Sequence, residues 1–288
     1  TPCGTLFPYT TLFRSVPIIA DIHYQPKAAE VAAEIVEKVR INPGNYVDRN
    51  RSSFTDTQYL DELKRIAARM EPLLSLCRKN KTVIRIGVNH GSLSQRIINR
   101  YGNTPQGMVE SALEFARICR KQNFHDLVFS MKASDVRIMV YATRLLVEKM
   151  LSEGMDYPLH LGVTEAGNEW DGRIRSAAGI GALLADGIVD TIRVSLTEAP
   201  ENELPVARKI AEPFEYLRTM KPARRPMKTG FTRKETYQVG LSGGNNKPVI
   251  ISRHPEMTKN KFLPDYIDAG SDKLKIERTE IDITDASK

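Results

Sequence analysis

The chain has 288 residues, enough for one large α/β domain or two smaller ones, and no apolar run is long enough to span a membrane. A net charge of +7 favours an anionic partner without identifying it. Three scattered cysteines are too few for a disulfide framework, which excludes a disulfide-stapled secreted domain and favours a reducing cytoplasm.

Residues 1–15 differ in character from the rest of the chain. The run from Thr5 to Ser15 resembles one reading frame of a widely used sequencing-library adapter. A β-rich N-terminus is the alternative, but the length of the uninterrupted match favours an artefact. We therefore exclude this segment from fold reasoning.

From Val16 onward, short apolar strand patterns alternate with amphipathic helical patterns. Strands are expected at 16–23, 38–42, 82–89, 126–132, 158–164 and 190–196. Helices are expected at 27–38, 56–78, 104–121, 134–153, 173–184 and 201–214. This alternation predicts a parallel α/β sheet, either a barrel or a doubly wound sheet. Polar residues end every strand, and no dinucleotide fingerprint follows the first one, so we favour the barrel.

Beyond about Pro222 the pattern changes to strands expected at 236–241, 248–252 and 273–279. Gly243-Gly244-Asn245 is interpreted as a hairpin turn rather than a phosphate loop. The basic run over 221–234 has no interleaved aromatic residues and is interpreted as a solvated linker. A nucleic-acid-binding module using this run is the alternative from a different functional class.

The strand ends carry an unusual set of charged and polar side chains. Arg85 lies in the middle of an apolar strand on the same face as Gly87 and Asn89, and a buried guanidinium requires a partner. If the six strands converge, their ends bring together Arg40, Arg85, Lys132, Arg193, Asp21, Asp135, Glu165, Asn42, Asn89, Ser134 and Ser195. The four cations exceed the three carboxylates, which predicts a multiply charged anion such as a diphosphate. An internal salt-bridge network is the alternative.

Two strand-end residues, Asp21 and His23, face the same side. They lack a third metal ligand at suitable spacing, so a hydrogen-bonding pair for a substrate hydroxyl is preferred. Glu165 either acts as an acid or base at the reacting centre or pairs with Arg193, and the sequence leaves both open. His90 and His160 are assigned the wrong strand parity for the polar face and are interpreted as structural.

Six ordered motifs resemble the 4-hydroxy-3-methylbut-2-enyl diphosphate synthase family. They are Ala20–His23, Arg40–Asn45, Ile84–Ser92, Val128–Asp135, Leu159–Gly167 and Arg193–Leu196. The resemblance covers Val16 to Ala211 and is closest to the larger form of the enzyme, which has an inserted domain after the barrel. It implies a partial TIM (β/α)8 barrel, similar to dihydropteroate synthase, with six of the eight βα units.

The resemblance also implies a domain plan: a probable artefact at 1–15, a substrate-binding barrel at 16–212, and a linker with the beginning of the inserted domain at 213–288. The family's C-terminal iron–sulfur domain, with three cysteines and a glutamate around a [4Fe-4S] cluster, is expected to be absent. On this view the chain is an internal fragment that is inactive alone.

The implied reaction is the reductive ring opening of 2-C-methyl-D-erythritol 2,4-cyclodiphosphate in non-mevalonate isoprenoid biosynthesis, with ferredoxin or flavodoxin as the electron donor. The full-length enzyme would be a monomer or a homodimer in the cytoplasm, or in the plastid stroma of a plant, with no nucleic-acid or membrane partner.

Site residues follow from the matched motifs. The diphosphate contacts map onto Arg40, Arg85, Lys132, Arg193 and Ser195, and other substrate contacts onto Asp21, His23 and Asn89. Glu165 matches the family's mouth carboxylate and is the expected catalytic residue, while Asn42 and Ser134 complete the predicted substrate-binding set. Another barrel enzyme for a phosphorylated or pterin-like substrate is the competing enzyme hypothesis.

Overall fold

The computed structural model describes residues 16–47, 53–188, 190–219, 235–238, 243–252, 266–268, 273–276 and 279–282. It divides the chain into two compact units, Thr1–Gly230 and Phe231–Lys288. The predicted artefact at 1–15 and the basic run at 221–234 lie outside the described residues. Within the described part, no helix has both the length and the apolar character that crossing a membrane requires.

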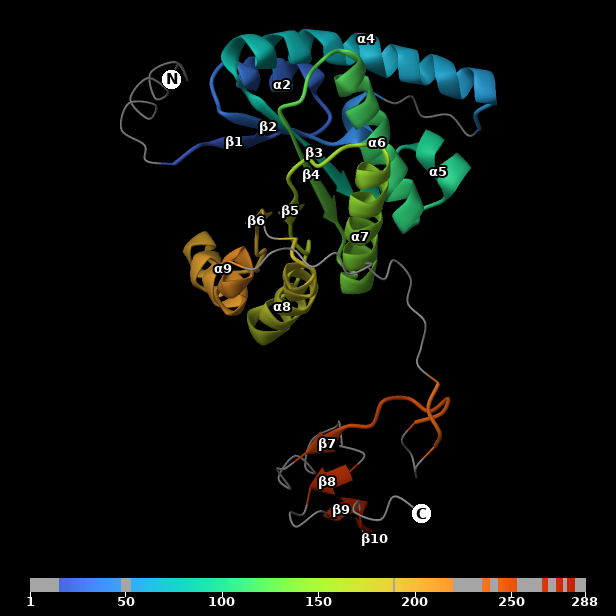
Figure 1. Cartoon of the computed structure of the whole chain (residues 1–288), viewed down its shortest axis with the longest axis vertical. Helices are drawn as coiled ribbons and strands as arrows, with labels where there is room; N and C mark the ends of the chain where they lie inside the picture. Colours follow the sequence, from blue (N-terminus) through green and yellow to red (C-terminus); the bar gives the residue numbers. More distant parts are fainter. Residues whose placement is uncertain are drawn as a thin grey trace. The chain divides into compact units, whose positions relative to one another are not determined.

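The described residues of the first unit form six parallel strands in chain order, labelled β1 to β6 in Figure 1. Four of them form one sheet, β1 (Ile19–Asp21), β2 (Lys38–Ile41), β3 (Val83–Asn89) and β4 (Leu127–Lys132). Two short strands, β5 (His160–Leu161) and β6 (Thr191–Ile192), form a parallel pair. A parallel bridge between Phe129 and Leu159 continues the order from β4 to β5. The predicted parallel arrangement is confirmed, although β5 and β6 are shorter than expected.

A helix follows each strand. These helices are α2 (Pro26–Ala33), α4 (Asp56–Asn80), α6 (Pro105–Lys121), α7 (Val136–Ser152), α8 (Glu169–Ala185) and α9 (Glu203–Ala211). Three shorter elements were not predicted from the sequence: α3 (Pro43–Tyr46), η1 (His90–Ser92) and α5 (Gln95–Tyr101). The helix predicted at 201–214 is flanked in the structure by two 3₁₀ segments, η2 (Pro200–Asn202) and η3 (Glu212–Thr219), with α9 between them. The predicted helix 27–38 stops at Ala33, because the chain must turn into β2 at Lys38.

Side-chain caps fix the starts of α4, α6 and α7. Thr55 caps α4 in a reciprocal capping box with Gln58. Thr104 accepts from the backbone N–H of Gly107, and Pro105 occupies the first turn of α6. Asp135 accepts from the backbone N–H groups of Arg137 and Ile138 at the start of α7. These caps lie at the starts of the helices predicted at 104–121 and 134–153.

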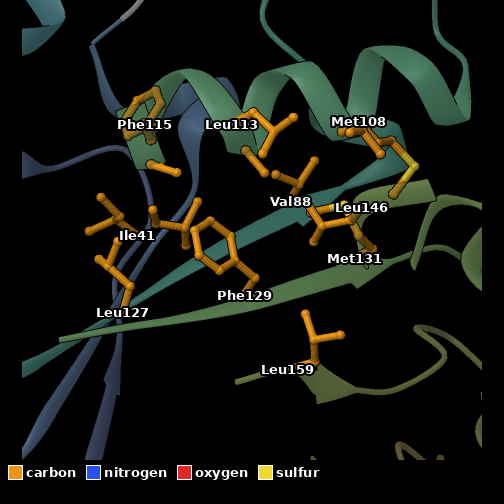
Figure 2. Close-up of a cluster of buried hydrophobic side chains, with 14 of the residues drawn as sticks. Ile41, Val88, Met108, Leu113, Phe115, Leu127, Phe129, Met131, Leu146 and Leu159 are labelled. Atoms are coloured by element: carbon orange, nitrogen blue, oxygen red, sulfur yellow. The ribbon is translucent and has the colours of Figure 1, made fainter. Parts of the chain in front are cut away.

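Successive residues of a strand point to opposite faces of the sheet, so core residues and site residues alternate along each strand. Alternate strand residues such as Ile41, Val88 and Phe129 are buried in the hydrophobic core with Phe115 of α6 and Leu146 of α7 (Figure 2). Residues of the opposite parity include Arg40, Arg85, Ser130 and Lys132. The helices therefore cover one face of the sheet, and the polar side chains project from the other.

The second unit contains β7 (Ile251–Ser252), β8 (Tyr266–Asp268), β9 (Lys273–Ile276) and β10 (Thr279–Asp282), in the sheet order β10-β9-β8-β7. β7 and β8 are parallel, and the other neighbours are antiparallel. The predicted turn is present, since the N–H of Asn246 donates to the carbonyl of Gly243.

The strand predicted at 236–241 is wrong over its described residues. Residues 235–238 are not strand. The Thr236 hydroxyl instead accepts from the backbone N–H of Gly244, which folds this segment back onto the turn. The predicted strand 248–252 is reduced to its last two residues, and 273–279 is divided between β9 and β10.

Candidate active site

The carboxyl ends of the six strands surround a pocket of about 160 Å³. It is lined by Asp21, His23, Arg40, Arg85, Asn89, Ser130, Lys132, Thr164 and Arg193. Seven of these were predicted from sequence, namely Asp21, His23, Arg40, Arg85, Asn89, Lys132 and Arg193. The structure thus brings all four predicted cations together, at the end of a parallel sheet where α/β barrels hold their active sites.

Arg40 is held in place by its surroundings. Its Nη1 donates to Asp21 Oδ1 over 2.7 Å and lies 2.6 Å from His23 Nε2. Its Nη2 donates to the Gly87 carbonyl over 2.9 Å and contacts Asn89 Oδ1 at 3.4 Å. Because a guanidinium only donates, His23 Nε2 must be the accepting nitrogen in this arrangement.

Gly87 makes room for this arginine. A Cβ at position 87 would lie 2.4 Å from Arg40 Nε and 3.1 Å from Ser130 Oγ. The strand period places Gly87 on the polar face but gives it no role there. The structure shows that the missing side chain is what allows the Arg40 guanidinium to cross β3.

The contacts of Arg40 also bear on the metal alternative for Asp21 and His23. The guanidinium already occupies the atoms that would ligate a metal, since it bonds both Asp21 Oδ1 and His23 Nε2. Burial would raise the pKa of Asp21, but the charge and hydrogen bond of Arg40 and the charge of Arg85 hold the pKa below its usual value. The carboxylate therefore stays ionised as the counter-charge of the pocket.

Arg85 is a buried cation with one unused donor. It is only 6% exposed, and its Nη2 lies 3.5 Å from Asp21 Oδ2. Its Nε is buried and has no hydrogen-bond partner among the described residues. Burial lowers the pKa of Arg85 to about 10, against the opposing effect of Asp21. A buried guanidinium with an unused donor is costly unless an acceptor from outside the chain completes it.

Lys132 is buried at the end of β4. Burial lowers the pKa of its ammonium group to about 7, and the charges of Arg85, Arg193 and Arg40 act in the same direction. The carboxylate of Asp21 opposes this effect. Among the lining residues, four cationic side chains therefore share one carboxylate, which leaves a surplus of positive charge for a bound anion.

Four predicted site residues do not line the pocket. Asn42 is buried and structural, because its Oδ1 accepts from the N–H of Gly44 and its Nδ2 donates to Ser92 Oγ over 2.8 Å. Ser134 and Glu165 are exposed, and Ser195 is half-buried. Each of these three lies beyond the last residue of its strand, where the strand period no longer fixes a direction.

Glu165, the expected catalytic residue, sits on an unusual backbone. Its φ is positive, at 51°, which places it in the left-handed region. No ion pair joins it to Arg193 in the described part of the chain, so the salt-bridge interpretation of Glu165 is not seen. Its catalytic role stays a prediction.

Three residues at the site were missed or misassigned. Ser130 and Thr164 line the pocket although they lay within motifs already singled out. Ser130 lies two residues before Lys132, and Thr164 lies two residues after Gly162, so the two-residue strand period could have placed both on the pocket side. His160 was assigned to the non-polar face, but it shares parity with Thr164, and the charges of Lys132 and Arg85 act on it. His90 is structural as predicted, with Nε2 at 3.1 Å from the Asn103 carbonyl.

The cysteines of the described residues do not suit an iron–sulfur cluster. Those residues contain no group of three or more His, Cys, Asp or Glu side chains placed to hold a metal ion. Cys77 and Cys119 are buried on α4 and α6, and burial raises the pKa of each thiol to about 12. Cluster ligands must be thiolates, so these residues do not fit such a group.

Comparison with known proteins gives a consistent result. The GcpE TIM-barrel domain matches residues 9–208. Curated relatives named 4-hydroxy-3-methylbut-2-en-1-yl diphosphate synthase (flavodoxin) include one from Phocaeicola vulgatus, 53% identical over a 269-residue alignment that covers 88% of this chain and 43% of the relative. One from Akkermansia muciniphila is 57% identical over a 205-residue alignment that covers 69% of this chain and 35% of the relative. The chain thus spans less than half the length of these relatives.

Proposed function

Because this chain belongs to the GcpE family of TIM-barrel domains, we propose that its cationic pocket binds 2-C-methyl-D-erythritol 2,4-cyclodiphosphate. The proposal places the chain in a 4-hydroxy-3-methylbut-2-en-1-yl diphosphate synthase, the name its relatives carry. The observation that carries it is the charge imbalance of the pocket, above all the buried and unused Nε donor of Arg85. A diphosphate offers the acceptor oxygens and the negative charge that this arrangement lacks.

The cations have different parts in this proposal. Arg40 is already bound to Asp21 and the Gly87 carbonyl, so it contributes a fixed positive field. Arg85 and Lys132 are buried with their charges largely uncompensated and provide the direct phosphate contacts. Arg193 is exposed at the pocket and closes on the outer phosphate oxygens. Asn89 and Thr164 are the neutral groups available for substrate hydroxyls.

Reduction of the substrate needs groups that the described residues do not supply. We assign electron delivery to other parts of the whole protein, with flavodoxin as the donor that the relatives' names specify. The described residues do not fit an iron–sulfur cluster, so none of them is assigned a part in electron transfer. The contribution of this barrel is to bind, orient and neutralise the diphosphate. The two buried, unpaired cysteines support a reducing, cytoplasmic setting.

We further propose that residues 213–288 begin an inserted domain. Support comes from the separate compact unit at Phe231–Lys288 and from the change from a parallel to a mixed sheet.

Calorimetric titration of the chain with the cyclic diphosphate tests the binding proposal. Arg85→Lys keeps the charge but removes the planar fork, so affinity should fall by roughly 10- to 100-fold, the value of one charge-assisted hydrogen bond. Arg137→Lys is the matched control, because Arg137 is 90% exposed on α7 and outside the pocket. Its affinity should equal that of the wild type. Failure of the wild type to bind, or equal binding by Arg85→Lys, would contradict the proposal.

A further inference from the structure

A groove of about 690 Å³ lies between α8 and α9 of the first unit, and it shares no lining residue with the cationic pocket. Figure 1 shows the two helices side by side. The segment η3 contributes Phe214 to the groove. Its volume falls within the range of about 300–1,000 Å³ that is usual for small-molecule sites. The proposed function makes no use of this α8–α9 groove.

The lining of the groove is mostly apolar. Val206 and Ile210 of α9 contribute side chains together with Phe214, and Trp170 of α8 lines the groove while staying 74% exposed. Glycine on α8 keeps the space open, because a Cβ at Gly181 would still lie 3.8 Å from the nearest atom of the Phe214 ring. A large exposed aromatic side chain beside an apolar groove is typical of a binding surface.

Both charged residues of the lining are cations, and no carboxylate of the described residues lines the groove. Arg173 is already engaged, because its Nη2 donates to Glu198 Oε2 over 2.9 Å and its Nη1 to the Glu169 carbonyl over 2.8 Å. Lys209 forms no ion pair or hydrogen bond within the part of the chain that the structure describes, not even with the exposed Glu212 one turn on. An uncompensated ammonium group therefore stands beside an apolar groove.

The size of the groove favours a small ligand over a protein partner. Eleven residues line it, whereas a stable protein interface uses about 20–30 residues a side. On α8 the lining runs from Trp170 to Gly181, which is about 16 Å along the helix axis. A groove of this length accepts an extended alkyl or prenyl chain.

We propose that the α8–α9 groove binds an amphipathic anion, meaning an alkyl or prenyl chain with a carboxylate or phosphate head. The chain lies against Trp170, Val206 and Phe214, and its burial removes apolar surface of both ligand and groove from water. The head contacts the Lys209 ammonium and supplies the counter-charge that the described residues do not provide. The inference concerns a second site and does not rest on the proposed function.

Trp170 makes the test direct, because it is the only tryptophan in the sequence. Titration of the full chain with decanoate and with geranyl diphosphate should shift the tryptophan emission to shorter wavelength as the ring leaves water. The tighter of the two anions identifies a fatty acid or a prenyl diphosphate as the source of this chemistry. Decanol, which has no charge, should bind roughly 5-fold more weakly than decanoate, and inorganic phosphate should leave the emission unchanged.

Two pairs of neighbouring substitutions serve as test and control. Lys209→Gln should weaken decanoate binding by roughly 5-fold, the value of one exposed ion pair, whereas Arg208→Gln, exposed and outside the lining, should not. Ala177→Leu fills the groove and should abolish the emission shift, whereas Ala178→Leu lies outside the lining and should keep it. Both alanines are exposed on α8 and leucine is a strong helix former, so both variants should fold.

An unchanged tryptophan emission with both anions would overturn the proposal, as would equal decanoate affinities of Lys209→Gln and Arg208→Gln. A shift on dilution of the chain without any ligand would assign the groove to a second copy and would also overturn it. Trp170 does not line the cationic pocket, and none of these measurements uses the cyclic diphosphate. Their outcome is therefore independent of the proposed function.

Discussion

Replacing Lys132 with methionine should stabilise the chain most at and below neutral pH, and the gain should shrink as the pH rises above about 7. The reason is the burial of the Lys132 ammonium among three arginines, which lowers its pKa to about 7 from an ordinary value of 10.5. Between these two values the unfolded chain binds a proton that the folded chain does not. The stability of the wild type therefore rises with pH across this window.

The size of the effect follows from the two pKa values. Each pH unit of separation corresponds to about 1.4 kcal/mol, so the Lys132 contribution should change by about 2.5 kcal/mol between pH 7.5 and pH 9.5. Methionine has a similar length and no titrating group. The difference in unfolding free energy between Lys132→Met and the wild type should therefore fall by that amount over the same interval.

Urea denaturation of both proteins at several pH values measures this difference, and the effects of titrating groups that do not interact with Lys132 cancel in the comparison. Adding inorganic diphosphate should reverse the order at pH 7.5, because the anion needs the charge that methionine lacks. A difference that stays constant from pH 7.5 to 9.5 would refute the argument, since Lys132 would then ionise as an ordinary exposed lysine.

Three further predictions concern residues with distinct roles around the pocket. Gly87→Ala places a methyl group 2.4 Å from Arg40 Nε, so it should lower the unfolding free energy in urea by about 1–3 kcal/mol and weaken cyclic diphosphate binding. Gly91→Ala is the control, because no atom lies within 4 Å of the added methyl group, and it should change neither quantity. Asn42→Ala removes the cap of α3 and the bond to Ser92, and should lower the unfolding free energy by about 1–2 kcal/mol, whereas an unchanged value would show that the cap is dispensable. Glu165→Gln should leave calorimetric binding of the cyclic diphosphate intact and lower turnover of the whole protein, and full turnover would end the catalytic assignment.

The sequence predicted the pocket best where side chains lie inside strands. The two-residue period of an apolar strand fixes which face a residue occupies, so the pattern alone was enough to group Arg40, Arg85 and Lys132. The parallel order of the strands followed from the alternation with helices.

The period says less beyond the last paired residue of a strand, where His23 and Arg193 line the pocket and other predicted residues do not. Ser134, Glu165 and Ser195 lie beyond the last paired residue of their strands, and loop geometry decides their direction. His160 was assigned to the non-polar face although it shares parity with Gly162 and with Thr164, which lines the pocket. The short helix α5 was not predicted, although Ser94 caps it by accepting from the backbone N–H of Ile97.

The surplus of positive charge at the strand ends is, on the view proposed above, a diphosphate site. A crystal structure of the chain with 2-C-methyl-D-erythritol 2,4-cyclodiphosphate tests this most directly. Phosphate oxygens are expected within hydrogen-bond distance of Arg85 Nε and of Lys132 Nζ, with Arg40 still bound to Asp21. A ligand bound elsewhere, or a pocket whose Arg85 Nε donates to another group of the protein, would contradict it.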